Sequence, residues 1–382
     1  MKNIFSSRER VVAALEHREP DRVPLDIGGY QSGITTIAYE KLKNKLGIVR
    51  PTIISERVQQ LAKIDEEVLK EFEIDTRYVF IKGSAFWDTK ETIDDSSISF
   101  FDEWGIQWKK PHTSFYYDPV GSPLKNASVK DIFQYYWPDP NDKSKFDGLE
   151  REAQVINNSG YALCTTVSGV FEQAWYLTGL ERMMIDTIEN PIFVNSLLDK
   201  VLDILSQQYS NFLDKVGQYL NLIEIWEDIS SQQGPLASPE LYRKIIKPRT
   251  KDLINLIKNK TKAKIALHSC GSVRWAIDDF FDIGVEVLNP VQVSAAHMDT
   301  KELKRKYGNS MSFWGGIDTQ WILPRGTTRE VNEEVKKRID DLGKGGGYLL
   351  GPVHNIQPDV PPENIITMFK TALSYGKYNS SQ

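Results

Sequence analysis

The sequence predicts one (β/α)8 barrel (TIM barrel) domain over residues 1–382. Three observations support this fold class: short apolar, β-branched runs recur along the chain, amphipathic stretches separate most of them, and eight such runs fit into one chain of this length. A doubly wound open sheet is built from the same units and is the alternative. The expected strands are Val23–Ile27, Arg77–Ile81, Ala162–Val167, Leu222–Trp226, Lys264–Leu267, Val285–Asn289, Ser312–Trp314 and Tyr348–Leu350.

Helix starts between these runs carry recognisable capping signals. Ser238–Glu240 offers an N-cap serine, a proline at the first helical position and an early acid. A strongly helical stretch covers Thr327–Leu342, and the last helix opens at Pro361–Glu363. Ser96–His112 alternates differently, with the period of a strand, and predicts a hairpin insertion after the second barrel strand.

Composition excludes several classes of function. Net charge is −5 and no basic tract occurs, so nucleic acid is not an expected partner. No apolar run reaches 18 residues and the N-terminus lacks an apolar signal segment, so we expect neither a membrane span nor secretion. Two cysteines make no disulfide framework, which favours the reducing cytoplasm. The sequence leaves the oligomeric state open, and a homodimer is compatible with it.

The segment Ala263–Gly271 (AKIALHSCG) runs from a short strand straight into a His-x-Cys pair. The chain has only five His and two Cys, yet His268 and Cys270 stand two residues apart. Strand side chains alternate with period two, so both point to the same side if the strand geometry persists. Imidazole and thiolate suit zinc. The alternative is a buried small thiol beside a hydrogen-bonded histidine.

A third ligand follows from the position of His354. In a barrel, chemistry lies at the C-terminal ends of the strands. His354 directly follows the last expected strand, as His268 ends the fifth. We therefore predict His268, Cys270 and His354 as metal ligands. The alternative for His354 is a loop histidine held by Asn355 or Gln357.

Glu227 and Asp228 follow the fourth expected strand and are the predicted catalytic carboxylates. Adjacent strand residues face opposite ways, so at most one should face the barrel mouth. That one could complete a zinc shell, orient a ligand histidine or act as acid or base; the other would cap a helix or form a salt bridge.

Four further residues are predicted substrate contacts from their places near strand ends: Asp26, Tyr30, Phe171 and Asp318. Packing is the alternative for Phe171. A cap for the following helix is the alternative for Asp318.

Taken together, these segments resemble the uroporphyrinogen decarboxylase superfamily, in particular its zinc-dependent corrinoid methyltransferase branch. The similarity is to methyltransferase I of O-demethylase systems and runs nearly end to end. The resemblance implies a (β/α)8 barrel, zinc, and a corrinoid (cobalamin) carried by a separate protein. It rests on SSRERVVAALEHREPDRVPLDIG, VSGVFEQAWYLTG, GPLASPELYRKIIKPR, IALHSCGSVRWAIDDFFDIGVEVLNPVQ, FWGGIDTQWILPRGT and GGGYLLGPVHNIQPDVPPENI.

One departure from the family concerns the loop after the first strand. Uroporphyrinogen decarboxylases carry an arginine-rich loop there, which holds the carboxylates of the porphyrinogen. Here residues 24–31 read PLDIGGYQ, with an acid and no arginine. A polyanionic tetrapyrrole would be poorly held, so we do not expect decarboxylase activity.

A second departure concerns the zinc ligands. Methyltransferases that methylate coenzyme M resemble this chain at His268 and Cys270 but carry a second cysteine ligand near the end of strand eight. The comparable stretch here offers His354, and Cys164 lies inside the third expected strand. Imidazole in place of thiolate makes the zinc shell one unit more positive, which suits an ether or alcohol oxygen as leaving group.

The leading hypothesis is a zinc-dependent methyltransferase that demethylates a methoxylated, aromatic small-molecule donor and passes the methyl group to a Co(I) corrinoid protein. The first alternative is the transfer of a methyl group from a methyl-corrinoid to a thiol. The second is a ligand-binding barrel that has lost catalysis.

Overall fold

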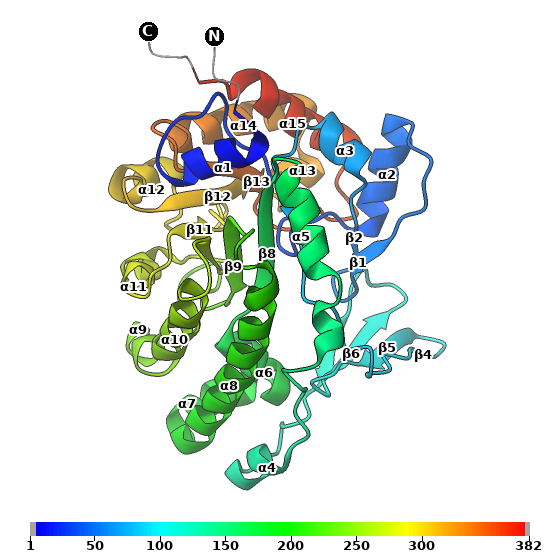
Figure 1. Cartoon of the computed structure of the whole chain (residues 1–382), viewed down its shortest axis with the longest axis vertical. Helices are drawn as coiled ribbons and strands as arrows, with labels where there is room; N and C mark the ends of the chain where they lie inside the picture. The colour runs from blue at the N-terminus through cyan, green and yellow to red at the C-terminus, as the bar shows by residue number, and fades with distance from the viewer. Residues whose placement is uncertain (1–4, 379–382) are drawn as a thin grey trace.

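A computed structural model describes residues 5–378 and has the (β/α)8 barrel architecture expected from the sequence (Figure 1). Seven parallel strands form one curled sheet, in the order β13-β12-β11-β10-β9-β8-β3, with helices around it. The strands are β3 (Thr76–Tyr78), β8 (Ala162–Ser168), β9 (Leu222–Trp226), β10 (Lys264–His268), β11 (Val287–Asn289), β12 (Ser312–Ile317) and β13 (Tyr348–Pro352).

The eighth strand position is occupied by an irregular segment. The sequence predicts a strand at Val23–Ile27, whereas the structure gives it a single parallel bridge, from Leu25 to Leu350 of β13. On its other side, the Asp75 N–H donates to the Leu25 carbonyl at 3.0 Å. The Leu25 N–H turns to the Asp75 carboxylate at 2.8 Å, so it is not available for a backbone ladder. The segment closes the barrel without forming a regular strand.

The N-terminal end of the barrel is plugged by α1 (Ser7–Leu15). Its side chains Val11 and Leu15 join a buried cluster with residues from the strands, which leaves the C-terminal ends as the open end. The strand members of this cluster are Ala162, Cys164, Leu222, Ala266, Val287, Trp314 and Leu349.

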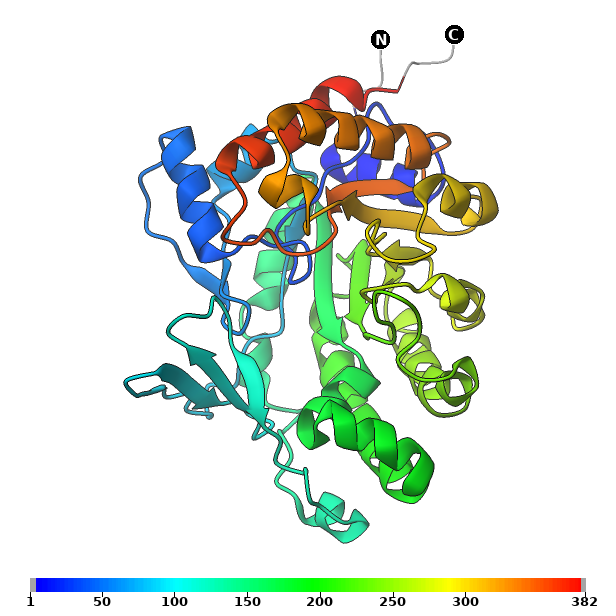
Figure 2. The same cartoon turned by 180° about the vertical axis from the view of Figure 1, so that it is seen from behind.

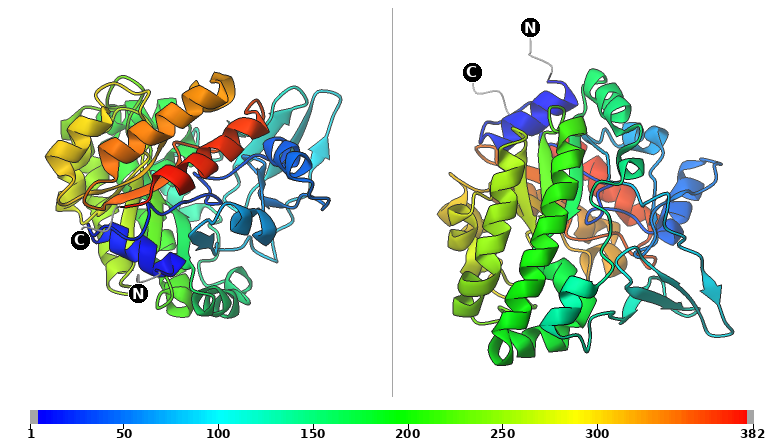
Figure 3. Two further views of the ribbon diagram at one scale, coloured as in Figure 1. Left: turned by 90° about the horizontal axis from the view of Figure 1, so that it is seen from above. Right: turned by 60° about the horizontal axis from the view of Figure 1, so that its bottom comes forward.

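The remaining helices surround the sheet, and the ribbon seen from above shows α14 and α15 side by side (Figure 3). Three predicted helix starts are confirmed: the Ser238 hydroxyl caps α9, Thr327 caps α14, and α15 begins at Pro362. The helices are α2 (Thr36–Leu46), α3 (Glu66–Glu71), α4 (Val129–Gln134), α5 (Leu149–Asn158), α6 (Val170–Thr178), α7 (Leu180–Glu189), α8 (Pro191–Val216), α9 (Pro239–Leu241), α10 (Lys247–Lys258), α11 (Ile277–Asp282), α12 (Thr300–Tyr307), α13 (Ile322–Arg325), α14 (Thr328–Leu342) and α15 (Pro362–Tyr375).

An antiparallel insertion follows β3 and projects from the flank of the barrel (Figure 2). Ser96–His112 contributes β5 (Ser97–Phe101) and β6 (Gln107–Pro111), which pair antiparallel, and β4 (Thr92–Ile93) and β7 (Asp118–Gly121) extend the sheet. The Trp108 ring of β6 lies 5.3 Å from the Tyr176 ring of α6. A separate two-stranded sheet pairs β1 (Ile54–Glu56) with β2 (Leu61–Ala62). Within residues 5–378, no helix is long and apolar enough to span a membrane.

The buried Asp75 carboxylate predicts a large stability loss on neutralisation. It accepts hydrogen bonds from Arg10 at 2.6 Å and Arg22 at 2.7 Å, and it is 0 % exposed. In Asp75→Asn the Arg22 and Arg10 guanidinium groups lose this buried counter-charge, because the amide is neutral, and Arg10 keeps only the partly exposed Asp21. We expect the free energy of unfolding to fall by about 3–5 kcal/mol, measured by urea denaturation.

Asp278→Asn is the matched control, because this side chain is 76 % exposed and lies 3.9 Å from Lys306. Its effect should stay within about 0.5 kcal/mol. Equal effects of the two substitutions would contradict a structural role for the Asp75 ion pairs.

Candidate metal centre

Three predicted ligand residues meet at the open end of the barrel. His268 ends β10, Cys270 follows it by two residues, and His354 lies two residues beyond the end of β13. One donor atom from each of the three lies within 4.8 Å of the other two. The structure therefore brings together two nitrogen donors and one sulfur donor from strands that are far apart in the sequence.

The His268 ring is oriented by the neighbouring strand. Asn289 is the register partner of His268 on β11, and its side-chain Oδ1 lies 2.5 Å from Nδ1. An amide oxygen only accepts, so this contact places the ring proton on Nδ1. The lone pair then lies on Nε2, which is 3.5 Å from the Cys270 sulfur. Such an outer hydrogen bond is how proteins fix the tautomer of a ligand histidine.

The Cys270 loop is held by its backbone. The Cys270 N–H donates to Asp228 Oδ1 at 2.7 Å, and the Gly271 N–H donates to Gln292 Oε1 at 2.6 Å. Gly271 has φ +92°, and a Cβ at this position would lie 2.3 Å from the Ser231 carbonyl oxygen. Only glycine fits this turn without displacing the neighbouring backbone.

His354 is positioned by the residue that follows it. Asn355 accepts the Gly33 N–H at 2.7 Å and donates to the Tyr30 carbonyl at 2.9 Å, which ties this loop to the loop after the first barrel segment. The centroids of the His354 and His268 rings are 5.8 Å apart and the planes are inclined by 62°. The loop after β13 and the end of β10 thus come together at the candidate metal centre.

Burial sets the protonation of the three groups. It lowers the pKa of His268 and of His354 to about 4, so both imidazoles are neutral at pH 7 and keep a lone pair. Burial also raises the pKa of the Cys270 thiol, with the nearby Asp228 carboxylate adding to the shift. A bound cation would reverse that shift by stabilising the thiolate. Two neutral imidazoles and one thiolate are a donor set that fits zinc.

Asp228 faces the centre together with a residue that the sequence analysis missed. The Asp228 N–H donates to Glu172 Oε2 at 3.0 Å, and the Tyr176 hydroxyl donates to Glu172 Oε1 at 3.0 Å. Burial, with the Asp228 charge next, raises the pKa of Glu172 to about 8, and burial also raises the pKa of Asp228. Glu172 is the one charged residue between 162 and 180, and that isolation was the available signal.

Glu227, the other predicted catalytic carboxylate, serves a helix instead. Its carboxylate accepts the N–H groups of Val170 and Glu172 at 3.1 and 2.9 Å and the Thr250 hydroxyl at 3.2 Å. A carboxylate at these unsatisfied N–H groups stabilises the N-terminus of α6. Glu227 therefore holds the helix that carries Glu172. Its carboxylate oxygens accept hydrogen bonds from α6 and Thr250, and not from the three predicted ligand residues.

Two of the predicted substrate contacts are acids with internal partners. Asp26 is 0 % exposed, and its carboxylate accepts hydrogen bonds from Thr76, Tyr78 and Trp314 inside the barrel. Asp318 accepts the backbone N–H groups of Gln320 and Ile322, so it caps the turn that leads into α13. Both carboxylates are satisfied by the protein.

The two predicted aromatic contacts separate in the structure. Tyr30 stacks on Phe80 with centroids 3.9 Å apart and lies 6.3 Å from the ring of Trp226, the last residue of β9. Trp226 is the register partner of His268. Tyr30 thus lies beside the mouth. Phe171 is 1 % exposed and belongs to the main hydrophobic core, which is a packing position.

Glu224 is a second residue that the sequence analysis did not single out. It lies on β9 with its side chain in the barrel, where Oε2 accepts the Thr166 hydroxyl at 2.9 Å. Its other oxygen, Oε1, is buried without a hydrogen bond and lies 3.7 Å from Nδ1 of His268. Burial raises the pKa of Glu224 to about 8.

The fold and the site define a (β/α)8 barrel that presents two imidazoles and a thiol beside paired carboxyl groups at its C-terminal mouth. The sequence of residues 127–375 matches the uroporphyrinogen decarboxylase (URO-D) family. The chain belongs to this family, which confirms the superfamily predicted from its motifs.

Individual relatives are distant. The chain is 22 % identical over 270 residues to a uroporphyrinogen decarboxylase of Rickettsia felis, covering 69 % of this chain and 74 % of the relative. It is 27 % identical over 207 residues to that of Geobacter sulfurreducens, covering 54 % of each. Among solved structures, a methyltransferase from Methanosarcina mazei is similar over 97 % of this chain and 99 % of that one, with TM-score 0.64 and 18 % identity. That likeness shows the fold.

The raised pKa of Glu224 predicts how the stability of the metal-free protein depends on pH. The folded chain keeps this carboxyl protonated up to about pH 8, whereas the unfolded chain ionises it near 4.5. Stability is therefore fully present below pH 4.5 and is lost as pH rises towards 8. Glu224→Gln stays neutral, so it should avoid a loss of about 3–5 kcal/mol between pH 5 and 9, measured by urea denaturation with a chelator.

The exposed Glu150→Gln variant controls for a general charge effect and should follow the wild type. If the wild type and Glu224→Gln lost equal stability on alkalinisation, the burial of an unpaired carboxyl at this position would not be its cause.

Proposed function

We propose that this protein is a zinc-dependent methyltransferase that removes a methyl group from a methoxylated aromatic compound and passes it to the Co(I) corrinoid of a separate protein. The observation that carries the proposal is the set of two imidazoles and one thiol whose donor atoms lie within 4.8 Å at the barrel mouth. His268, Cys270 and His354 would hold the zinc. When bound, zinc would polarise the ether oxygen and stabilise the departing phenolate.

The chain's own residues prepare this chemistry in two ways. Asn289 holds the proton on the far nitrogen of His268, and Asp228 holds the Cys270 loop through its backbone N–H. Glu172, with a pKa of about 8, carries a proton at neutral pH and shares its contact with Asp228. This carboxyl pair can deliver a proton to the leaving oxygen, which gives Asp228 the catalytic role expected of it together with Glu172.

Substrate recognition is proposed to rest on aromatic side chains at the mouth. Tyr30 and Trp226 lie near the metal centre, and Tyr176 extends the aromatic surface towards Trp108 of the insertion. Flat apolar surfaces of this kind suit an aromatic ring. Asp26, Asp318 and Phe171 would shape the pocket indirectly, through the barrel interior, the α13 turn and the core. We further propose a reducing, cytoplasmic setting, which keeps Cys270 a free thiol.

Decarboxylation of a porphyrinogen is less well supported by the mouth. Glu172 and Asp228 are both buried there, and no arginine occurs in residues 24–31. A substrate with many carboxylates would meet acids where it needs guanidinium groups.

Zinc content is the first test. We expect about one zinc per chain in the wild type at neutral pH, because the three donors match the preferred ligands of zinc. Loss of one ligand should weaken zinc binding by about 10²-fold or more in His268→Ala, Cys270→Ser and His354→Ala, measured by competition with a chromogenic chelator. Cys164→Ser is the matched control, because Cys164 is buried away from the site and should leave the affinity unchanged. A folded wild-type protein that binds no zinc when zinc is in excess would contradict the proposal.

Methyl transfer is the second test. Co(I) corrinoid protein should be methylated when a methoxylated aromatic compound and the zinc-loaded protein are both supplied, read from the visible spectrum of the corrinoid. Glu172→Gln should lower the turnover rate by about 10²-fold without removing zinc, because general acid catalysis is worth about that much. Turnover only in the opposite direction, from methyl-corrinoid to a thiol, would favour the alternative transfer. Tight binding without turnover in either direction would favour a ligand-binding barrel.

A further inference from the structure

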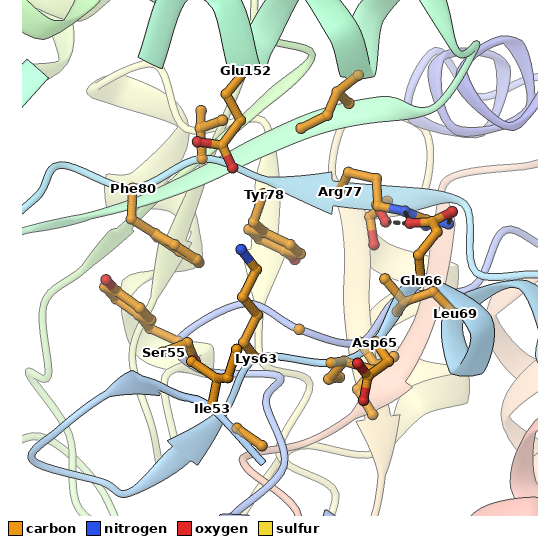
Figure 4. A pocket seen from close by; sticks show the side chains of 18 of the residues that line it. Ile53, Ser55, Lys63, Asp65, Glu66, Leu69, Arg77, Tyr78, Phe80 and Glu152 are labelled. Carbon is orange, nitrogen blue, oxygen red and sulfur yellow. Dashed lines mark hydrogen bonds and ion pairs between the residues drawn. The ribbon is translucent and has the colours of Figure 1, made fainter. Parts of the chain in front are cut away.

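The flank of the barrel carries a cavity of about 670 Å³ (Figure 4). It lies between residues 76–83 of β3 and the following loop, the segment from β2 into α3, and helix α5. Its volume is within the range of about 300–1,000 Å³ typical of small-molecule sites, and most of its lining is apolar. None of the three ligand residues of the metal centre lines it.

An aromatic wall separates this cavity from the barrel mouth. The rings of Tyr30 and Phe80 are parallel within 6°, and the rings of Phe80 and Tyr78 within 9° at 5.6 Å. All three residues line the cavity, while Tyr30 also approaches Trp226 at the mouth. The wall lies between the irregular first segment and β3, which are not paired with each other as neighbouring strands.

Most charged groups of the lining are already engaged. Arg77 pairs with Glu66, the Asp65 carboxylate accepts the Tyr39 hydroxyl, and the Lys82 ammonium donates to a backbone carbonyl.

Two opposite charges of the lining remain. Lys63, which follows β2, and Glu152 of α5 point into the cavity (Figure 4). Both residues are solvent-exposed, and in the described part of the chain neither side chain makes a hydrogen bond or an ion pair with another residue. The cavity therefore offers a cation and a carboxylate that meet only solvent, and a flat aromatic wall.

We propose that this flank cavity is a second small-molecule site, which binds an aromatic carboxylate that also bears a hydroxyl group. The Lys63 ammonium pairs with the carboxylate of the ligand. The ring lies against the wall of Phe80 and Tyr78, and the phenolic hydroxyl donates to Glu152. Each polar group of such a ligand then meets a group of matching chemistry.

The same geometry predicts discrimination between a phenol and its methyl ether. A phenol has a proton to donate to Glu152, whereas a methyl ether has none and leaves the carboxylate without a donor. If the proposed demethylation also holds, which is the one point where this inference rests on it, the site prefers the class of the product over the class of the substrate. The binding itself needs neither zinc nor corrinoid.

Calorimetric titration of the zinc-free full-length chain tests the site with 4-hydroxybenzoate as probe, and with 4-methoxybenzoate and benzoate for comparison. We expect 4-hydroxybenzoate to bind at least fivefold more tightly than the other two. Lys63→Met should weaken binding of all three by about tenfold, because the carboxylate loses its partner. Glu152→Gln should reduce the preference for the phenol while the affinity for benzoate stays the same.

Lys82→Met is the matched control, because Lys82 also lines the cavity but donates its ammonium hydrogen to the Asp147 carbonyl. It should bind as the wild type does, and so should His268→Ala. The proposal is overturned if millimolar 4-hydroxybenzoate does not bind, or if Lys63→Met leaves binding unchanged while His268→Ala abolishes it. The second result would place the ligand in the mouth. A failure of methyl transfer would leave these outcomes unaffected, so the two proposals fail separately.

Discussion

The closure of the barrel around the buried Asp75 carboxylate is the constraint on which the rest of the structure depends. One carboxylate accepts hydrogen bonds from Arg10 of the plug helix, from Arg22 and from the Leu25 N–H. It therefore joins the plug, the irregular first segment and the start of β3 at one point. Two guanidinium groups can be buried there because the geometry is bidentate in character and every acceptor is used.

Closure matters for the metal centre because the centre spans the barrel mouth. His268 and Cys270 lie at and just after the end of β10, whereas His354 lies just after β13, which pairs with the closing segment through Leu25. Asn355 then ties the His354 loop to the loop after that segment. The N-terminal plug and the His354 loop are thus connected by hydrogen bonds through the first barrel segment.

Burial decides the protonation state of most titratable groups at the barrel mouth. Burial removes the proton from His268 and His354 and keeps the protons on Glu172 and Glu224, so these four side chains are uncharged at pH 7 in the metal-free protein. A cation is the one addition that stabilises the Cys270 thiolate and is tolerated by this arrangement. Burial likewise raises the pKa of Glu227, to about 7, although backbone N–H groups at the start of α6 oppose that shift.

The sequence by itself determined seven of the barrel strands and the family, and it predicted the three residues whose donor atoms meet at the barrel mouth. This was possible because strand period, strand-end position and rare residue types are local properties. It could not decide which carboxylate faces the centre, because Glu227 and Asp228 are adjacent. Only tertiary contacts placed Glu227 at the N-terminus of α6 and Asp228 at the Cys270 loop. The sequence alone likewise could not predict the positions of Glu172 and Glu224 or the flank cavity. Each depends on side chains that meet across 40 or more residues of sequence, and such meetings are fixed by tertiary packing, not by pattern.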